Sequence, residues 1–529
     1  MNLKQKIGQM LIVGFKGKTA SAEIKKLIRE YHIGGVILFS RNIGTPNEIL
    51  QLTTDLQLEA KNAGYERPLF ICIDQENGAV RRLGDGTTIV PGAMLLGATH
   101  KPELAYEAGK ITGSELKALG INWNLAPIVD VNNNPLNPVI GVRSFGENPH
   151  HVSQFALEMI KGMQEVGVIT TLKHFPGHGD TEVDSHLDLP IITHDINRLH
   201  EVELVPFKTC IANGADTVMT AHVYFPAIEQ EFNRPATLSK KVISGLLRDE
   251  LGFDGVVTTD CMEMDAIAKR IGTEKGGVEA VKAGVDLVMV SHLYDRQINT
   301  IEAIYNAVKD GELSEERIDE SLTRINRLKD QYINWSQIEE KPKVSQDVGS
   351  KEHQYISEKI YEKGITIAEN DHIFPIKLSE EDRLLVVYPR NDYATLVEDQ
   401  RYATMTLGKE IQKLHTNTDV IQLETPIKDK DIKEVLSKAN EYKYIIAGTL
   451  NAFSDQQQQK LVRELIKTNI PIVAIATRSP YDLNYFFGLK GAICTYEFSK
   501  PALRMAAHAL FGKVNVKGKL PVTLSKVSS

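Results

Sequence analysis

Short apolar runs recur through the first two-thirds of the chain, and stretches with helical periodicity separate them. A continuous apolar run of a few residues is typical of a strand that is buried on both faces of a parallel sheet. Residues 151–166 and 196–213 show instead the spacing of amphipathic helices. The eight strand-like runs are IGQMLIVG, GGVILFS, LFICID, NWNLAP, ITTLKH, TVMTAH, GVVTTD and DLVMVS.

Eight strands alternating with helices predict a (β/α)₈ TIM-type barrel, an α/β fold, over residues 1–335. Active sites in this fold lie at the C-terminal ends of the strands. Buried parallel strands are normally apolar throughout, so a polar side chain that closes a run needs solvent, a partner or a substrate. Residues of this kind are Asp74, Lys173, His174, His222 and Asp260. The pattern therefore predicts a functional site at this end of the barrel.

A second domain is predicted after the barrel. Residues 336–354 are polar and irregular, which is typical of a linker. Residues 355–529 alternate apolar runs with amphipathic helices, and this order predicts a smaller α/β sandwich domain. The runs are GITIAE, RLLVVYP, YKYIIAGT, IPIVAIAT and GAICTY. The QQQQ at 456–459 is interpreted as an exposed helix start.

Composition and charge narrow the class of protein. Of 529 residues, 42% are hydrophobic and 25% are charged, an ordinary globular mixture that supports a large core. The net charge is −8, without a basic run interleaved with aromatics, which argues against nucleic acid and anionic membranes as partners. The sequence does not indicate an oligomeric state.

The cysteines and the N-terminal segment indicate the cellular compartment of the protein. The four cysteines are widely separated and lack a metal-binding spacing, so we expect free thiols in a reducing compartment. The first apolar patch is too short for a signal peptide or a membrane span. We therefore expect a cytoplasmic protein, although a secretion signal that had been removed would leave the same pattern.

The densest polar segment is 173–190, KHFPGHGDTEVDSHLDLP, in which two glycines allow a tightly bent loop. It can be interpreted as a solvated surface loop. A metal site is a second interpretation, opposed by the irregular ligand spacing and by Lys173. Acid–base chemistry is the third, because the Asp184 carboxylate could orient the His186 imidazole. An imidazole pKa of about 6.5 suits a group that gives and then takes a proton.

The segment K-H-F-P-G-H-G-D-T-x-x-D-S-H resembles the signature of glycoside hydrolase family 3, and of its β-N-acetylglucosaminidase branch in particular. In that branch an Asp–His dyad on a mobile loop replaces the glutamate acid/base that other members carry in their second domain. The resemblance implies that His186 is the general acid/base and that Asp184 is its orienting partner. GFDGVVTTDCMEMDAI resembles the nucleophile strand of the family, which implies Asp260 as nucleophile. Taken alone, Asp260 could instead cap a helix.

Further motifs imply the sugar-binding residues. IDQENGAVRRL resembles the family motif D-x-E-G-G-x-V-x-R, with Asn77 at the position of the first glycine. Arg143 could alternatively form a structural ion pair with Glu147, and His222 and Met262 are weaker candidates. FGKVNVKGKLPVTL resembles the end of the second domain of the family. The residues implied to bind the sugar are Asp74, Arg82, Arg143, Lys173 and His174.

The expected activity is the retaining removal of terminal, non-reducing β-linked N-acetylglucosamine, with muropeptides from peptidoglycan as substrates. Retention follows when two carboxyl-type groups about 5 Å apart flank the anomeric carbon. No metal or cofactor is expected. A phosphorylase on the same fold and a non-catalytic sugar-binding protein are the alternatives. Water is favoured over phosphate because the identifiable cations, Arg82, Arg143 and Lys173, are all assigned to the sugar.

Overall fold

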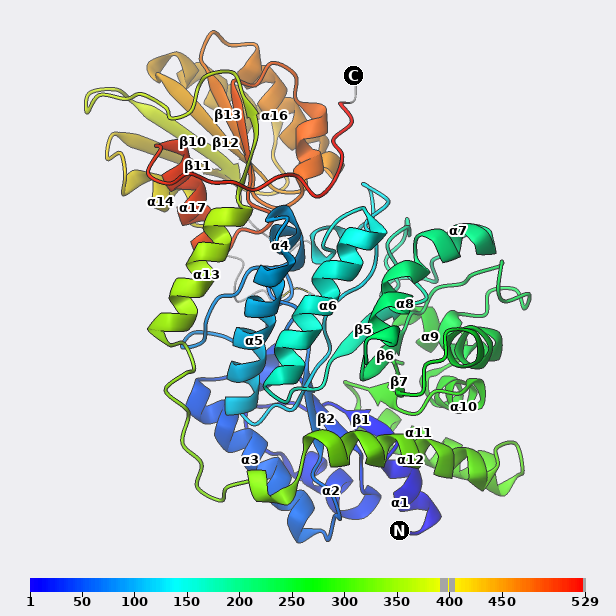
Figure 1. Ribbon diagram of the computed structural model, residues 1–529. Helices are drawn as coiled ribbons and strands as arrows, with labels where there is room; N and C mark the ends of the chain where they lie inside the picture. Colours follow the sequence, from blue (N-terminus) through cyan, green and yellow to red (C-terminus); the bar gives the residue numbers. More distant parts are fainter. Residues whose placement is uncertain (391–397, 399–404, 527–529) are drawn as a thin grey trace.

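The computed structural model describes residues 1–390, 398 and 405–526, and its first domain is built around eight parallel strands (Figure 1). They pair in a five-stranded sheet of order β4-β3-β2-β1-β8 and a three-stranded sheet of order β5-β6-β7. Parallel bridges Trp123–Ile169 and Thr258–Leu287 connect the two sheets. The strands are β1 (Leu11–Val13), β2 (Gly35–Leu38), β3 (Phe70–Ile73), β4 (Trp123–Asn124), β5 (Thr171–Phe175), β6 (Thr217–Thr220), β7 (Val256–Thr259) and β8 (Val288–Val290). The predicted α/β barrel fold is confirmed, and each strand falls on one of the eight apolar runs.

Helices alternate with these strands and surround them (Figure 1). They are α1 (Leu3–Gly8), α2 (Ala22–Tyr31), α3 (Pro46–Asn62), α4 (Ala93–Ala98), α5 (Pro102–Ala118), α6 (Pro149–Glu165), α7 (Ile196–Glu201), α8 (Leu204–Ala212), a π-helical segment Lys241–Glu250, α9 (Asp265–Ala268), α10 (Thr273–Ala283), α11 (Tyr294–Lys309) and α12 (Glu315–Tyr332). The helix expected over 196–213 is interrupted at Val202 and Glu203. Pro206 lies in the first turn of α8, and because it has no N–H it cannot continue a hydrogen-bonded helix from α7.

The second domain contains a six-stranded sheet of order β11-β10-β12-β13-β14-β9, in which only β9 is antiparallel to its neighbour. Its strands are β9 (Thr366–Asn370), β10 (Leu384–Pro389), β11 (Thr418–Leu423), β12 (Tyr444–Thr449), β13 (Ile472–Ala476) and β14 (Gly491–Cys494). Its helices are α13 (Lys351–Gly364), α14 (Leu407–Gln412), α15 (Asp429–Lys438), α16 (Gln456–Ile466) and α17 (Lys500–Leu510). The predicted α/β sandwich is confirmed, with the edge strand β11 in addition to the five predicted runs.

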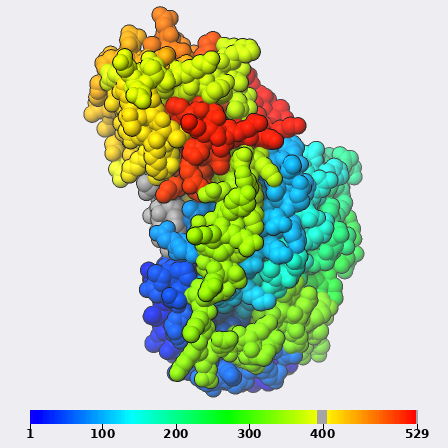
Figure 2. Space-filling view, turned by 60° about the vertical axis from the view of Figure 1, so that its left-hand side comes forward, coloured from blue at the N-terminus to red at the C-terminus, as the bar shows by residue number. Residues whose placement is uncertain are grey.

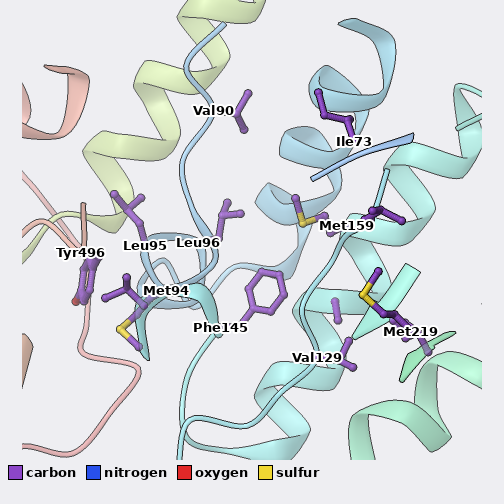
Figure 3. Close-up of a cluster of buried hydrophobic side chains, with 14 of the residues drawn as sticks. Ile73, Val90, Met94, Leu95, Leu96, Val129, Phe145, Met159, Met219 and Tyr496 are labelled. Carbon is purple, nitrogen blue, oxygen red and sulfur yellow. The ribbon is translucent and has the colours of Figure 1, made fainter. Parts of the chain in front are cut away.

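The chain between the domains follows the outer side of the barrel domain. Residues 338–350 form neither helix nor strand, and α13 begins at Lys351, so the last four residues of the predicted linker are helical. Figure 2 shows this yellow-green segment lying along the surface of the barrel domain. Figure 3 shows Met94 and Leu95 of α4 in one buried cluster with Tyr496 of the second domain.

The C-terminal segment also binds the barrel domain. The Lys519 N–H donates to the Ala98 carbonyl at 2.8 Å, and the Glu147 N–H donates to the Pro521 carbonyl at 3.2 Å. Ala98 and Glu147 belong to segments that follow β3 and β4, so the second domain is held near the C-terminal ends of barrel strands. Within the described part of the chain, no helix combines the length and apolarity needed to cross a membrane.

Candidate active site

A cavity of about 650 Å³ lies at the C-terminal ends of the barrel strands. The eighth predicted site residue, Asp184, does not line it but contacts His186, which does. The structure thus brings all eight residues into one region, while their roles stay predictions. The seven that line the cavity are Asp74, Arg82, Arg143, Lys173, His174, His186 and Asp260.

Asp260 follows the last residue of β7, and its Oδ1 accepts a hydrogen bond from the Cys261 N–H at 2.7 Å. The helix-cap interpretation is wrong, because the next helix, α9, begins at Asp265 with Met264 at its N-cap. Burial alone would raise the pKa of the Asp260 carboxyl. The neighbouring imidazoles, His222 first among them, nevertheless hold that pKa below its ordinary value. An ionised carboxylate facing a cavity can act as a nucleophile.

Asp184 and His186 form a hydrogen-bonded pair. Asp184 Oδ1 lies 2.7 Å from His186 Nδ1 and also accepts the His186 N–H at 2.9 Å. Burial acts to raise the pKa of Asp184, but the hydrogen bond from His186 outweighs it and lowers that pKa. The carboxylate therefore fixes Nδ1 as the nitrogen that carries the hydrogen and leaves Nε2 for a substrate.

His178 supports the same loop. Its Nδ1 lies 2.9 Å from Thr181 Oγ1 and its Nε2 lies 3.0 Å from Ser185 Oγ, so both ring nitrogens are engaged. Burial, followed by the charge of His174, lowers the pKa of His178 to about 4. A neutral imidazole therefore connects Thr181 to the residue that precedes His186.

Four alternating charges form a buried network on one side of the cavity. Lys173 Nζ lies 2.8 Å from Asp74 Oδ1 and 2.6 Å from Glu76 Oε1. Arg143 donates two hydrogen bonds to Glu76, at 2.8 and 2.9 Å. The Arg143–Glu147 alternative is therefore wrong. Burial would raise the pKa of Glu76, but the two cations hold it well below its ordinary value.

Glu76 was not singled out from the sequence, although it occupies the glutamate position of the motif D-x-E-G-G-x-V-x-R. The turn after it requires left-handed backbone, with φ of 69° at Asn77 and 58° at Gly78. Asparagine tolerates this region better than most residues, so the departure at Asn77 keeps the turn. Gln75 Oε1 accepts the Arg82 N–H at 2.9 Å, which positions the arginine of the motif.

Asp130 is a second residue that the sequence analysis missed. It is fully buried, and its Oδ2 lies 2.8 Å from His174 Nδ1 while its Oδ1 accepts the His178 N–H at 2.7 Å. Burial opposes ionisation, yet the charge of His174 and its hydrogen bond lower the pKa of Asp130. Asp130 closes the apolar segment LAPIV after β4, and this strand-end signal could have revealed it.

The cavity is also lined by residues that were not predicted. Arg41 and Phe39 follow β2, and His292 follows β8. Arg41 adds a cation to the three identified from the sequence, so the argument that no cation is left for phosphate is wrong. Glu398, from the second domain, also lines the cavity and forms an ion pair with Arg478.

The two weaker candidates, His222 and Met262, are surrounded by other parts of the protein in the way that structural residues are. His222 Nδ1 lies 2.8 Å from Thr237 Oγ1 and its Nε2 lies 3.0 Å from the Cys261 carbonyl oxygen, so both nitrogens are engaged within the protein. Met262 is fully buried in the core. Other methionines line the cavity instead, namely Met219, Met264 and Met289.

Among the described residues, a group with metal-like spacing forms at Cys261, Glu263 and His292, whose possible ligand atoms lie within 4.8 Å of one another. The Glu263 carboxylate already accepts the N–H groups of His292 and Leu293, at 2.6 and 3.0 Å. Arg41 Nη1 lies 3.3 Å from His292 Nδ1. A guanidinium at this position opposes a divalent cation.

A barrel whose strand-end cavity combines an ionised carboxylate with an imidazole–carboxylate pair and a charged sugar-sized pocket has the architecture of a glycoside hydrolase. Comparison with known proteins identifies the family. The pattern of the glycosyl hydrolase family 3 N-terminal domain matches residues 2–328, and that of the family 3 C-terminal domain matches residues 365–529. The chain belongs to glycosyl hydrolase family 3.

Two relatives match all or nearly all of the chain, and a third matches about half of it. A solved family 3 β-N-acetylglucosaminidase from Paenibacillus sp. str. FPU-7 is 41% identical with a TM-score of 0.93, and the match covers 100% of both chains. Beta-hexosaminidase A from Pseudoalteromonas piscicida is 31% identical over 96% of this chain and 92% of the relative. A beta-hexosaminidase from Xylella fastidiosa is 38% identical over 54% of this chain and 83% of its own length.

Proposed function

We propose that this glycoside hydrolase is a retaining, exo-acting β-N-acetylglucosaminidase. The observation that carries the proposal is the Asp184–His186 pair, joined at 2.7 Å, whose imidazole faces the same cavity as Asp260. The names of the Paenibacillus, Pseudoalteromonas and Xylella relatives support the same activity.

In the first step Asp260 attacks the anomeric carbon while His186 Nε2 gives its proton to the departing glycosidic oxygen. The C–O bond to the leaving sugar breaks, and a glycosyl ester forms on Asp260. In the second step the neutral imidazole takes a proton from water as the water oxygen attacks the anomeric carbon. The bond between that carbon and the Asp260 oxygen breaks, which frees the Asp260 carboxylate. Asp184 accepts the Nδ1–H throughout and stabilises the imidazolium that exists before the first step and forms again in the second.

The charged network holds the terminal sugar. Hydroxyl groups both donate and accept, so carboxylates such as Asp74 and cations such as Lys173 bind them with fixed orientation. Glu76 keeps Lys173 and Arg143 in place through contacts of 2.6 to 2.9 Å. Asp130 does the same for His174.

The natural substrates in this proposal are muropeptides from peptidoglycan, and the location is the cytoplasm. The four free, buried cysteines support a reducing compartment. Cell fractionation with an antibody to the protein tests the location. Recovery of the protein outside the cytoplasm would remove that part of the proposal.

A phosphorylase is the second candidate, because Arg41 supplies a cation that the sugar network does not use. We keep water as the acceptor. A phosphate dianion is usually held by several N–H groups of a helix N-terminus or a Gly-rich nest, and Arg41 already donates to two backbone carbonyls.

Product analysis tests the proposal. A β-1,4-linked N-acetylglucosamine disaccharide is incubated with millimolar phosphate, and products are followed by proton and phosphorus NMR. We expect free N-acetylglucosamine, first formed as the β-anomer, at a rate independent of phosphate. Accumulating N-acetylglucosamine 1-phosphate would establish the phosphorylase, an α-anomer would remove retention, and an unreacted disaccharide would remove the proposed activity.

A further inference from the structure

A groove of about 660 Å³ lies on the second domain, and its volume is close to that of the active-site cavity. It follows one face of α16, from Gln456 at the start of that helix to Lys467 just after its end (Figure 1). Tyr485 and Phe487 line it from the segment before β14. Concave sites of this size are typical of small-molecule binding. In the described part of the chain no residue lines both the groove and the active-site cavity, so the groove is a separate feature.

Arg463 supplies the groove with a cation that lacks a protein counter-ion. Its Nε–H donates to the Tyr485 carbonyl at 3.0 Å, which ties the guanidinium to the aromatic segment. Among the described residues, neither of its Nη nitrogens has a carboxylate or another acceptor within hydrogen-bond distance. The four N–H groups on these nitrogens are therefore available to a ligand.

The other charges of the groove are already paired. Lys460 binds Asp429 of α15 at 2.8 Å, and Lys467 binds Glu464 at 2.6 Å. The lining thus contains three cations and the single acid Glu464, although the whole chain has a net charge of −8. A local excess of positive charge attracts an anion. The ligand that complements this groove carries negative charge, and Arg463 is the cation placed to bind it directly.

The groove also presents an aromatic surface and a length that suits a chain of sugars. Phe487 is 52% exposed, which leaves apolar ring surface in contact with solvent. A pyranose offers C–H groups on its faces and hydroxyls at its edge, so a ring beside a guanidinium matches both parts. The 11 residues of α16 extend over about 16 Å, which is longer than a single sugar ring.

We propose that this groove binds an acidic oligosaccharide, with a sugar ring on Phe487 and a sugar carboxylate on Arg463. A guanidinium fork binds a carboxylate through two parallel hydrogen bonds. The inference rests on the proposed function for the class of ligand. One end of the groove lies beside the domain junction, because Gln459 donates to the Phe453 carbonyl at 3.3 Å and Phe453 lines a small cavity together with Pro135 of the barrel domain. An oligosaccharide bound here is kept close to the active site, which raises its effective concentration there.

Two tetrasaccharides that differ only in their carboxylates test the inference. Both contain two repeats of N-acetylglucosamine linked to N-acetylmuramic acid, and one carries primary amides in place of the carboxylates. Titration calorimetry uses the full chain with Asp260→Ala, which prevents turnover. We expect two sites per chain for the acid form. Arg463→Gln should weaken one of them about tenfold or more, the scale of a lost charge-assisted hydrogen bond. The amide form should bind that site weakly in both proteins.

Phe487→Ser is an independent variant, because an exposed ring can be removed without disturbing the core. It should weaken the same site for the acid and the amide forms alike. Arg504→Gln is the control for charge, since Arg504 is 36% exposed and pairs with Glu358 away from the groove. Tyr355→Ser removes a ring that is 62% exposed elsewhere and is the control for aromatic loss. Both controls should bind as the parent does, and melting temperatures verify the folding of every variant.

The outcomes separate the inference from the proposed function. With Asp260 intact, the groove variants should hydrolyse an aryl N-acetylglucosaminide at the wild-type kcat/KM. If the wild type does not hydrolyse that substrate, the proposed function is wrong. If it does, then a single site per chain, or unchanged binding in both groove variants, overturns the inference. Equal affinity of the groove for acid and amide would show that the carboxylate is not recognised. Binding of inorganic phosphate that is lost in Arg463→Gln, without tetrasaccharide binding at the groove, would show a simple anion site and also overturn the inference.

Discussion

Asp260 and Glu76 are both carboxylates with lowered pKa values in one cavity, but their surroundings suit different tasks. Glu76 is bound by Lys173 and Arg143, whose charges it neutralises. Asp260 is near imidazoles, and in the described part of the chain no lysine or arginine pairs with it. Asp260 is therefore ionised without being neutralised, which leaves its electron pair for the anomeric carbon.

Replacing Asp260 with Ala should abolish turnover while changing the free energy of unfolding by no more than about 1 kcal/mol, because a strand-end carboxylate without an ion pair contributes little to packing. Steady-state kinetics and denaturant unfolding measure the two effects. A 5-fluoro glycosyl inhibitor should label Asp260 in the wild type. Full activity in the variant, or a label on another residue, would remove the nucleophile assignment.

His186→Ala should reduce turnover of disaccharides at least about a hundredfold, because their leaving oxygen needs a proton, and should reduce departure of an aryl leaving group far less. Asp184→Ala should show the same pattern, since the 2.7 Å contact that orients the imidazole is lost. Rates on matched disaccharide and aryl substrates measure the difference. Equal losses on both substrates would show that His186 has only a structural role.

Glu76→Gln should destabilise the protein by about 3–5 kcal/mol at neutral pH, because two buried cations lose their shared partner. The folded pKa of Glu76 lies below its ordinary 4.5, so the stability it contributes is present above pH 4.5 and is lost as pH falls. Unfolding at several pH values should therefore show a difference from wild type that shrinks below about pH 4.5. Glu66→Gln, at a side chain 74% exposed, is the control. A pH-independent difference would contradict this origin of the pKa shift.

Residues carried by continuous motifs were accessible from the sequence, and residues brought together by folding were not. Asp74, Arg82, Lys173 and Asp260 each lie in a short sequence motif at the end of a predicted strand or just after one. Arg41 meets Phe15 and Ser291, which are 26 and 250 positions away along the chain. No spacing rule reaches across such separations, so its role depends on the closed arrangement of the strands.

At the scale of elements, the loop that carries the dyad depends on close backbone contact. A Cβ at Gly179 would lie 1.7 Å from the Val131 carbonyl oxygen, and Asn137 Nδ2 donates to the Gly179 carbonyl at 2.9 Å. The loop is thus held against the segment after β4, and this contact sets the position from which Asp184 and His186 reach the cavity.

Gly179→Ala should displace this loop and lower disaccharide turnover about a hundredfold, the cost of roughly 1 Å of misplacement in a catalytic group. Aryl substrates, which need His186 less, should lose less. Gly245→Ala is the matched control, because its nearest neighbour to an added Cβ is 4.0 Å away. Circular dichroism verifies folding of both variants. Wild-type disaccharide turnover in Gly179→Ala would contradict the positioning argument.

Elements that are buried along their whole length could be predicted from the sequence. Elements in which buried and exposed residues are mixed could not. The barrel strands are buried along their length, so apolar runs located all eight. Strand β11 has mixed exposure and polar residues, and its pattern is not distinctive. The QQQQ segment does begin α16, but Gln458 and Gln459 are buried and donate to the Leu450 and Ala452 carbonyls, so the expected exposure is wrong for this pair.

At the scale of the molecule, the second domain completes the surroundings of the cavity. Glu398 borders the cavity, and its partner Arg478 follows β13. Glu497, after β14, accepts the Gly92 N–H of the barrel domain at 2.8 Å and the Tyr361 hydroxyl of α13 at 2.6 Å. Gly92 lies against Gly78 of the sugar-binding turn, so the domain contact and the site share one segment.

Glu497→Ala should therefore weaken the connection between the domains and the site together. The side chain is 4% exposed and accepts hydrogen bonds from Gly92, Tyr361 and Ser499, so its removal leaves buried donors unpaired at about 1–3 kcal/mol each. In the wild type this contact, the buried cluster around Tyr496 and the C-terminal segment predict one cooperative unfolding transition. In Glu497→Ala, calorimetry should show a transition at lower temperature that is broader and divides toward two components. KM should rise because residues 74–92 are held less firmly.

Glu358→Gln is the control, because it removes an exposed charge that is paired with Arg504 inside the second domain. It should change neither measurement appreciably. An unchanged single transition with wild-type KM in Glu497→Ala would show that the apolar cluster and the C-terminal segment hold the domains together without this carboxylate.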